Sequence, residues 1–217
     1  MKYVIALVAV VALRLLLYPL LKRLIMMLFV RQGVRGALED AGRQAVAKQP
    51  DRITLVHRDL HSWKADPAVP KFADALFSRG FQEAGLFAAR ELPGVMVRFL
   101  VKSTDGVIAA ICTHPRAGVW LDLMTYYQDG RSATYSTNKA SGLDPRPGHP
   151  IMHAPGSGAV ELYERCLRER PKGVFKPILP DDAPTMFERA YAEALAWRRQ
   201  KGVSAAEVAQ VAQRRAS

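Results

Sequence analysis

The stretch VMVRFLVKSTDGVIAAICTHPRAGVWLDLMTYYQDGRSATYST, residues 95–137, carries the strongest structural signal in this chain of 217 residues. Apolar and polar side chains alternate along it with a period of two, and turn residues interrupt the alternation at intervals typical of antiparallel strands. Two connections are Asp-Gly pairs, at 105–106 and 129–130, which favour a two-residue type I′ hairpin because both of its central residues take positive φ. The pattern predicts an antiparallel β-meander, with candidate strands over 81–91, 95–103, 107–114, 119–128 and 131–137.

The turns also predict a register, and the register sorts the side chains onto two faces. A loop at Asp105-Gly106 pairs Val101 with Ala110, and a four-residue loop over 115–118 sets Cys112 opposite Leu121. One face is then almost wholly apolar and needs helices to cover it: Val95, Val97, Phe99, Val101, Ile108, Ala110, Cys112, Val119, Leu121 and Leu123. The other, the mixed face, gathers aromatic and hydrogen-bonding groups: Arg98, Leu100, Lys102, Ala109, Ile111, Thr113, Trp120, Asp122, Met124, Tyr126, Tyr135 and Thr137.

Helical patterns flank the meander. Composition and periodicity predict helices over 33–48, 70–79, 158–170 and 183–201, and a short strand over 53–57. Ser204 and Glu207 have the spacing of a capping box that opens a last helix. Residues 139–158 contain four Pro and four Gly without a period, which predicts a long loop that is either functional or disordered.

Residues 3–21, YVIALVAVVALRLLLYPLL, carry Arg14 as their one charge, and their length is close to the ~20 residues that cross a bilayer. The alternatives are a cleaved signal peptide and a buried helix. No small-residue cleavage site follows the run, and no polar face interrupts residues 3–13, so a single-pass transmembrane helix is favoured. The basic residues after it predict a cytoplasmic domain and contacts with the membrane surface: Lys22, Arg23, Arg31 and Arg35.

These patterns define the expected architecture. The fold class is α+β: an N-terminal transmembrane helix, then an antiparallel meander of about five strands packed with helices. The expected parts are a transmembrane or interfacial anchor (1–31), a helical stalk (32–50), an α+β soluble domain (51–201) and a basic C-terminal helix or tail (202–217).

Charge is concentrated at the two ends of the chain. The net charge of +11 divides into +6 over residues 1–50, +1 over 51–196 and +4 over 197–217. Phosphate-backbone binding would need a basic stripe across the folded domain, so this distribution argues against a nucleic-acid partner. Basic ends beside an apolar segment favour a bilayer with anionic headgroups.

Few residues carry recognisable chemistry. The pairs His57/His61 and His149/His153 have helical spacing, but Pro150 interrupts the second pair and neither includes the Glu of an HExxH motif, so no metal site is predicted. The sequence holds no nucleophile elbow, P-loop or dinucleotide fingerprint, and we predict no catalytic residue and no cofactor. The candidate ligand- or partner-binding residues lie on the mixed face and in the 139–158 loop: Arg98, Trp120, Asp122, Tyr126, Tyr135, Asp144, Arg146, His149 and His153.

Residues 93–138, together with GLDPRPGH at 142–149, resemble a pattern found in uncharacterised bacterial proteins with one N-terminal membrane segment and a small α+β domain. The resemblance implies a single-pass protein of the bacterial inner membrane, and it implies no activity.

Three functions are consistent with these features. The one we favour is a non-enzymatic, membrane-anchored cytoplasmic module that binds a ligand or partner through the mixed face. The alternatives are a hydrolase-type enzyme using that face and the 139–158 loop, and an accessory subunit that docks onto a membrane-protein partner.

Overall fold

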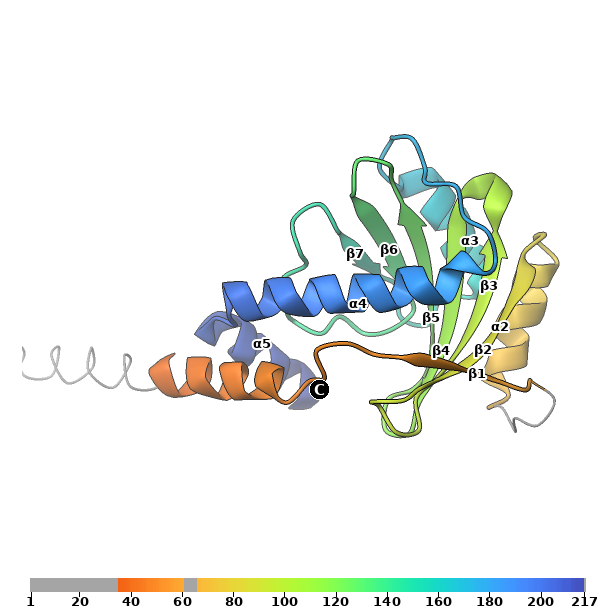
Figure 1. Cartoon of the computed structure of the whole chain (residues 1–217). Coiled ribbons are helices and arrows are strands. Elements are labelled where there is room, and N and C mark those ends of the chain that lie inside the picture. The colour runs from red at the N-terminus through yellow and green to blue at the C-terminus, as the bar shows by residue number, and fades with distance from the viewer. Residues whose placement is uncertain (1–34, 61–65, 217) are drawn as a thin grey trace, which may run out of the picture.

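The structure, a computed structural model, describes residues 35–60 and 66–216. The chain is α+β, as the sequence predicts, with a mostly antiparallel sheet between helices (Figure 1). Its strands are β1 (Leu55–Arg58), β2 (Gln82–Ala89), β3 (Met96–Lys102), β4 (Val107–His114), β5 (Gly118–Tyr126), β6 (Ser132–Ser136) and β7 (Ile151–His153). Its labelled helices are α2 (Ala68–Phe77), α3 (Ala159–Glu169), α4 (Asp182–Lys201) and α5 (Ala205–Ala216). A further helix over residues 35–47, which we call the stalk helix, precedes β1.

The sheet is a meander whose seven strands lie in chain order. All neighbouring pairs are antiparallel except β6 and β7, which are parallel. The five strands predicted over 81–137 are confirmed, and so is the short strand near residue 55. The prediction of a structureless 139–158 loop is wrong at its centre. There β7 pairs with β6. Strand β7 is only three residues long and is therefore too short to show a period.

The first Asp-Gly connection forms a different turn from the predicted one. Ser103–Asp105 make a 3₁₀ turn, and Gly106 alone takes a positive φ, of 62°. The loop is therefore four residues long, and Val101 pairs with Ile108 instead of Ala110. A shift of two residues preserves the alternation, so the faces of β3 and β4 keep their predicted membership.

The connections on either side of β5 correct the predicted faces. The loop between β4 and β5 has three residues, because Gly118 joins the strand opposite His114 with a φ of 75°. The Asp129-Gly130 turn also has one residue more than predicted, and Gly130 alone there takes positive φ. Each change shifts the register by one residue, and a one-residue shift turns every side chain of a strand to the other face.

Both faces of the sheet are consequently covered. Leu121 and Leu123 pack with Leu100 and Ile111 on the face under α2 and α3, the α2/α3 face. Trp120 and Met124 share the opposite face with Phe99 and Cys112. Helix α4 covers this second face, the α4 face, where the Phe187 ring packs against that of Phe99 with centroids 5.4 Å apart.

Helix α4 fits the sheet along its first half only. Ala183, Met186 and Phe187 pack on the sheet, whereas the second half extends past β7 toward α5 and the stalk helix (Figure 1). Leu195 lies there in a separate small core with Val46 of the stalk helix and Val203.

The predicted transmembrane helix over Tyr3–Leu21 lies outside the described residues, as do Lys22, Arg23 and Arg31. Within the part of the chain that the structure describes, no helix is both long enough and apolar enough to span a bilayer.

Candidate functional site

A cavity of about 610 Å³ opens where α4 diverges from the sheet. Its floor is the α4 face of β5–β7, its far wall is the second half of α4, and the segment over residues 138–146 borders it. Stalk-helix residue Val46 and α5 residue Gln210 also reach its lining. The cavity therefore collects side chains from distant parts of the sequence.

The floor holds three polar side chains side by side on adjacent strands. Asp122 of β5 pairs with Ser136 of β6, which pairs with His153 of β7. The indole Nε1 of Trp120 donates a hydrogen bond of 3.0 Å to Asp122 Oδ2. Burial raises the pKa of the Asp122 carboxyl, and hydrogen bonds from Ser136 and Trp120 and the charge of His153 oppose that rise. Asp122 is thus a desolvated carboxyl group that lines a cavity.

His153 and Ser136 are oriented by the backbone that follows β6. His153 Nδ1 donates to the carbonyl oxygen of Asn138 over 2.9 Å, which leaves Nε2 as the second ring nitrogen. The Ser136 hydroxyl accepts a 3.1 Å hydrogen bond from the Asn138 amide, and the residue is only 3% exposed. The Ser136 hydroxyl bonds to the Asn138 amide and to the Asp122 carboxyl. Because Ser136 is also enclosed, it positions Asp122 and is poorly placed as a nucleophile.

A second cavity of about 240 Å³ adjoins the first and shares Arg146 and His149 with it. The Arg146 guanidinium pairs with Glu193 Oε2 at 3.0 Å and donates to His149 Nε2. His149 Nδ1 lies 2.8 Å from the Ser132 hydroxyl, so the imidazole is held on both sides. Burial and the charge of Arg146 lower the pKa of His149, which keeps the ring neutral. Tyr126 lines this smaller cavity, and burial raises the pKa of its hydroxyl.

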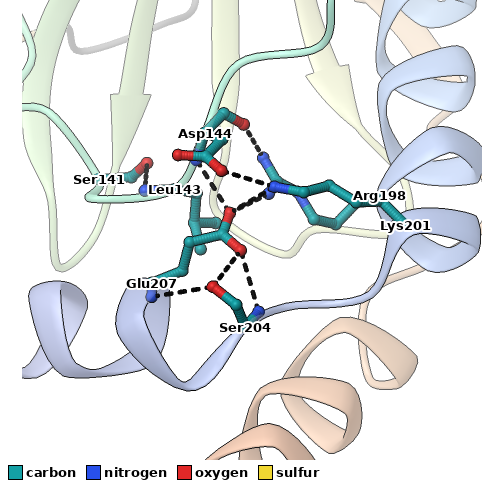
Figure 2. Close-up of polar contacts among 7 residues, drawn as sticks. All are labelled: Ser141, Leu143, Asp144, Arg198, Lys201, Ser204 and Glu207. Carbon is teal, nitrogen blue, oxygen red and sulfur yellow. Dashed lines mark hydrogen bonds and ion pairs between the residues drawn. The ribbon is translucent and has the colours of Figure 1, made fainter.

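An ion-pair network fixes the border of the larger cavity (Figure 2). Glu207 of α5 is only 3% exposed and accepts from Arg198 Nη1 at 2.8 Å, from Lys201 Nζ at 3.1 Å and from the Asp144 amide at 3.0 Å. The predicted capping box is confirmed, since the Ser204 amide donates to Glu207 Oε2 at 2.9 Å and the Glu207 amide donates to the Ser204 hydroxyl oxygen at 3.3 Å.

The charge of Glu207 is strongly held. Burial alone would raise the pKa of its carboxyl, but hydrogen bonds from Ser204, Asp144 and Lys201 outweigh burial and lower the pKa to about 2. Arg198 also donates to the Asp144 carbonyl oxygen, and Lys201 Nζ lies 2.7 Å from Asp144 Oδ2. Glu207 thereby binds the segment over residues 138–146 to both α4 and α5.

The structure brings together six of the nine predicted binding residues around the larger cavity. These are Trp120, Asp122, Asp144, Arg146, His149 and His153, and Tyr126 joins them through the smaller cavity. The other two lie on the opposite side of the sheet, contrary to prediction, because of the register at β5.

Arg98 and Tyr135 have structural surroundings on the α2/α3 face. Arg98 pairs with Glu83 at 2.7 Å and lies over the ring of Phe77, 5.6 Å from its centroid. Tyr135 is 1% exposed within the core under α3. Of the predicted membrane-surface residues, Arg35 is described, and it pairs with Glu39 at 2.9 Å on the stalk helix.

Sequence reasoning missed the contribution of α4 to the site. Tyr191, Ala194, Leu195 and Arg198 all line the larger cavity. Their spacing of three and four residues places them on one helical face, a signal that was present in the sequence. The spacing does not reveal that this helical face lines a cavity.

The two cysteines are remote from nucleophilic chemistry. Cys112 and Cys166 are both buried free thiols. Burial raises the pKa of Cys112 well above its ordinary value and that of Cys166 to about 12, so both remain protonated. In the described part of the chain, no group of three or more His, Cys, Asp or Glu side chains could hold a metal ion.

Comparisons with protein-family models, with curated proteins and with solved structures gave no match to this chain.

Proposed function

We propose that this chain is a membrane-anchored ligand-binding module, whose site is the cavity between β5–β7 and the second half of α4. The observation that carries the proposal is the constellation on the cavity floor. A desolvated carboxyl at Asp122 lies beside the large aromatic side chain of Trp120, in a space open to a small molecule. Ligand sites typically combine an apolar cavity with a few polar groups that fix orientation.

The apolar part of the lining supports binding over a purely structural role. Ile151 is 47% exposed although it is a large aliphatic residue, and its side chain lines both cavities. Leu143 and Tyr191 add apolar surface to the larger cavity. Covering such surface with a ligand releases water and is favourable by about 25 cal/mol per Å².

The anchor and its location remain proposals from the sequence. The apolar run over residues 3–21 and the basic residues after it support a single-pass helix with the folded domain in the cytoplasm. Anionic lipid headgroups are the proposed partners of Lys22, Arg23, Arg31 and Arg35. Deleting residues 1–31 should move the protein from the membrane fraction to the supernatant. Full-length protein in the supernatant would contradict the anchor.

Ala194→Phe tests the binding site, because Ala194 is an exposed helical residue that lines both cavities. A phenyl ring there should fill the space between α4 and the sheet and abolish the binding of small aromatic fragments. Fragment binding to the full chain in detergent is measured by saturation-transfer NMR. The matched control is Ala196→Phe, at an exposed position of α4 outside both cavities. Equal fragment binding by both variants would contradict the proposed site.

A further inference from the structure

The charges that line the larger cavity are not equally compensated. Among the cations of its lining, Arg146 is paired with Glu193 and Arg198 with Glu207, whereas Lys139 and Arg214 lie at exposed positions. Lys201, which follows on the same helix as Arg198, is paired with Glu207 and Asp144. Arg146 and Arg198 therefore already face carboxylates of the protein, while the exposed positions of Lys139 and Arg214 allow water and salt to screen their charges. An anionic ligand would have to compete with those pairs to reach Arg146 or Arg198.

Asp122 is in the opposite situation. Its hydrogen-bond donors, the indole of Trp120 and the hydroxyl of Ser136, carry no charge. His153 is the titratable group that acts on it electrostatically, and one ring nitrogen of His153 is engaged by the Asn138 carbonyl oxygen. A carboxylate removed from water without a full cationic partner is costly, and a cation brought by a ligand would offset that cost.

The surroundings of Asp122 also suit a cation with an apolar body. Aromatic faces attract organic cations, and the cavity is lined by Trp120, Tyr191 and Trp197. Trp197 already lies against cations of the protein, with the Arg198 guanidinium 4.8 Å and Lys201 Nζ 5.3 Å from its ring. The floor near Asp122 thus offers charge, hydrogen-bond acceptance and an aromatic surface together.

We infer that the ligand of this cavity is an organic ammonium compound, whose charged nitrogen donates hydrogen bonds to Asp122 while its apolar body lies against Trp120 and Tyr191. The inference rests on the proposed function, since it names the class of molecule that the same cavity takes. It assigns Asp122 as the residue that selects a cation over a neutral or anionic molecule of equal size.

Three probes with the same phenyl body test the inference. 2-Phenylethylamine, 2-phenylethanol and phenylacetate are titrated into the full chain in detergent by calorimetry, with empty micelles as the blank. The amine should bind at least tenfold more tightly than the alcohol, and phenylacetate should bind most weakly. Asp122→Asn should reduce the affinity for the amine to that for the alcohol and leave the alcohol unchanged.

Asp74→Asn is the matched control, because it removes the same charge from an exposed position of α2, on the opposite side of the sheet. It should keep the preference for the amine. An alcohol that binds as tightly as the amine to the wild-type protein would overturn the inference without any variant, as would phenylacetate binding most tightly.

The result also separates the inference from the proposed function. If all three probes bind equally and Ala194→Phe abolishes their binding, the preference for an ammonium ligand is overturned and the proposed ligand site is kept. No binding of any probe at millimolar concentration would overturn both.

Discussion

Replacing Glu207 by Gln removes the negative charge at the centre of the network that borders the cavity. The pKa of about 2 in the folded protein, against an ordinary value of 4.5, means that folding favours the ionised form. At about 1.36 kcal/mol per pKa unit, the difference corresponds to about 3 kcal/mol of folding free energy at neutral pH. Gln keeps one acceptor oxygen but leaves Arg198, whose side chain is 14% exposed, without its buried partner. We expect a loss of about 2–4 kcal/mol.

The measurement is urea unfolding of the full chain in detergent at pH 7, followed by circular dichroism. Glu164→Gln is the control, because Glu164 forms an exposed ion pair with Arg79 at a similar distance, 3.0 Å. An exposed pair contributes about 0–1 kcal/mol. If the two variants lose the same small amount, the reasoning that burial strengthens the Glu207 network is refuted.

The pH dependence gives a second measurement of the same network. Because the pKa of Glu207 is lower in the folded than in the unfolded chain, its contribution is fully present above about pH 5. It is lost as the pH falls from 4.5 toward 2. The stability difference between wild type and Glu207→Gln should therefore shrink over that interval. A difference that stays constant down to pH 2 would contradict the assigned pKa. Hydrogen exchange should show residues 141–146 losing protection in the variant at neutral pH.

Three further predictions test the fold. Phe99→Ala and Leu121→Ala should each cost about 2–5 kcal/mol, and the double variant should show additive losses by urea unfolding because the two side chains lie on opposite faces of the sheet. Strong coupling between them would support the register predicted from sequence. Gly130→Ala should cost about 1 kcal/mol in the same assay, since its φ of 86° strains any side chain although nothing crowds the site. Cys112 and Cys166 should resist iodoacetamide in the native protein and react on unfolding, as measured by mass spectrometry.

The meander could be predicted from sequence because its signal is local. Alternation with a period of two depends only on neighbouring residues, and Gly106 and Gly130 mark turns wherever they occur between such runs. The lengths of the loops could not be predicted in the same way. In all three turns around β4 and β5, glycine alone takes the positive φ, so the chain forms loops that need one left-handed residue instead of two.

The predicted site residues share a face only where the error in the predicted loop length is an even number of residues. The error of two residues at Ser103–Gly106 changed no face, whereas the error of one residue before Gly118 separated Trp120 from Arg98. Trp120 and Asp122 remained together because they belong to one strand. His153 was predicted to lie in a loop, and it comes to lie near Trp120 and Asp122 because β7 pairs with β6. That pairing has no local signal in the sequence.

The closure of the cavity and the position of the stalk helix depend on the same packing. Val46 of the stalk helix lies in one small core with Leu195 and Val203, and it also lines the cavity. Gly42 allows this approach, because a Cβ there would lie 2.9 Å from Val208 Cγ2 of α5. Since Glu207 of α5 holds the border of the cavity, we expect a change in the packing of the stalk helix on α5 to alter the cavity proposed as the ligand site. In the sequence, the stalk helix follows the segment proposed as the membrane anchor, so it is the described element that would connect the proposed attachment to the cavity.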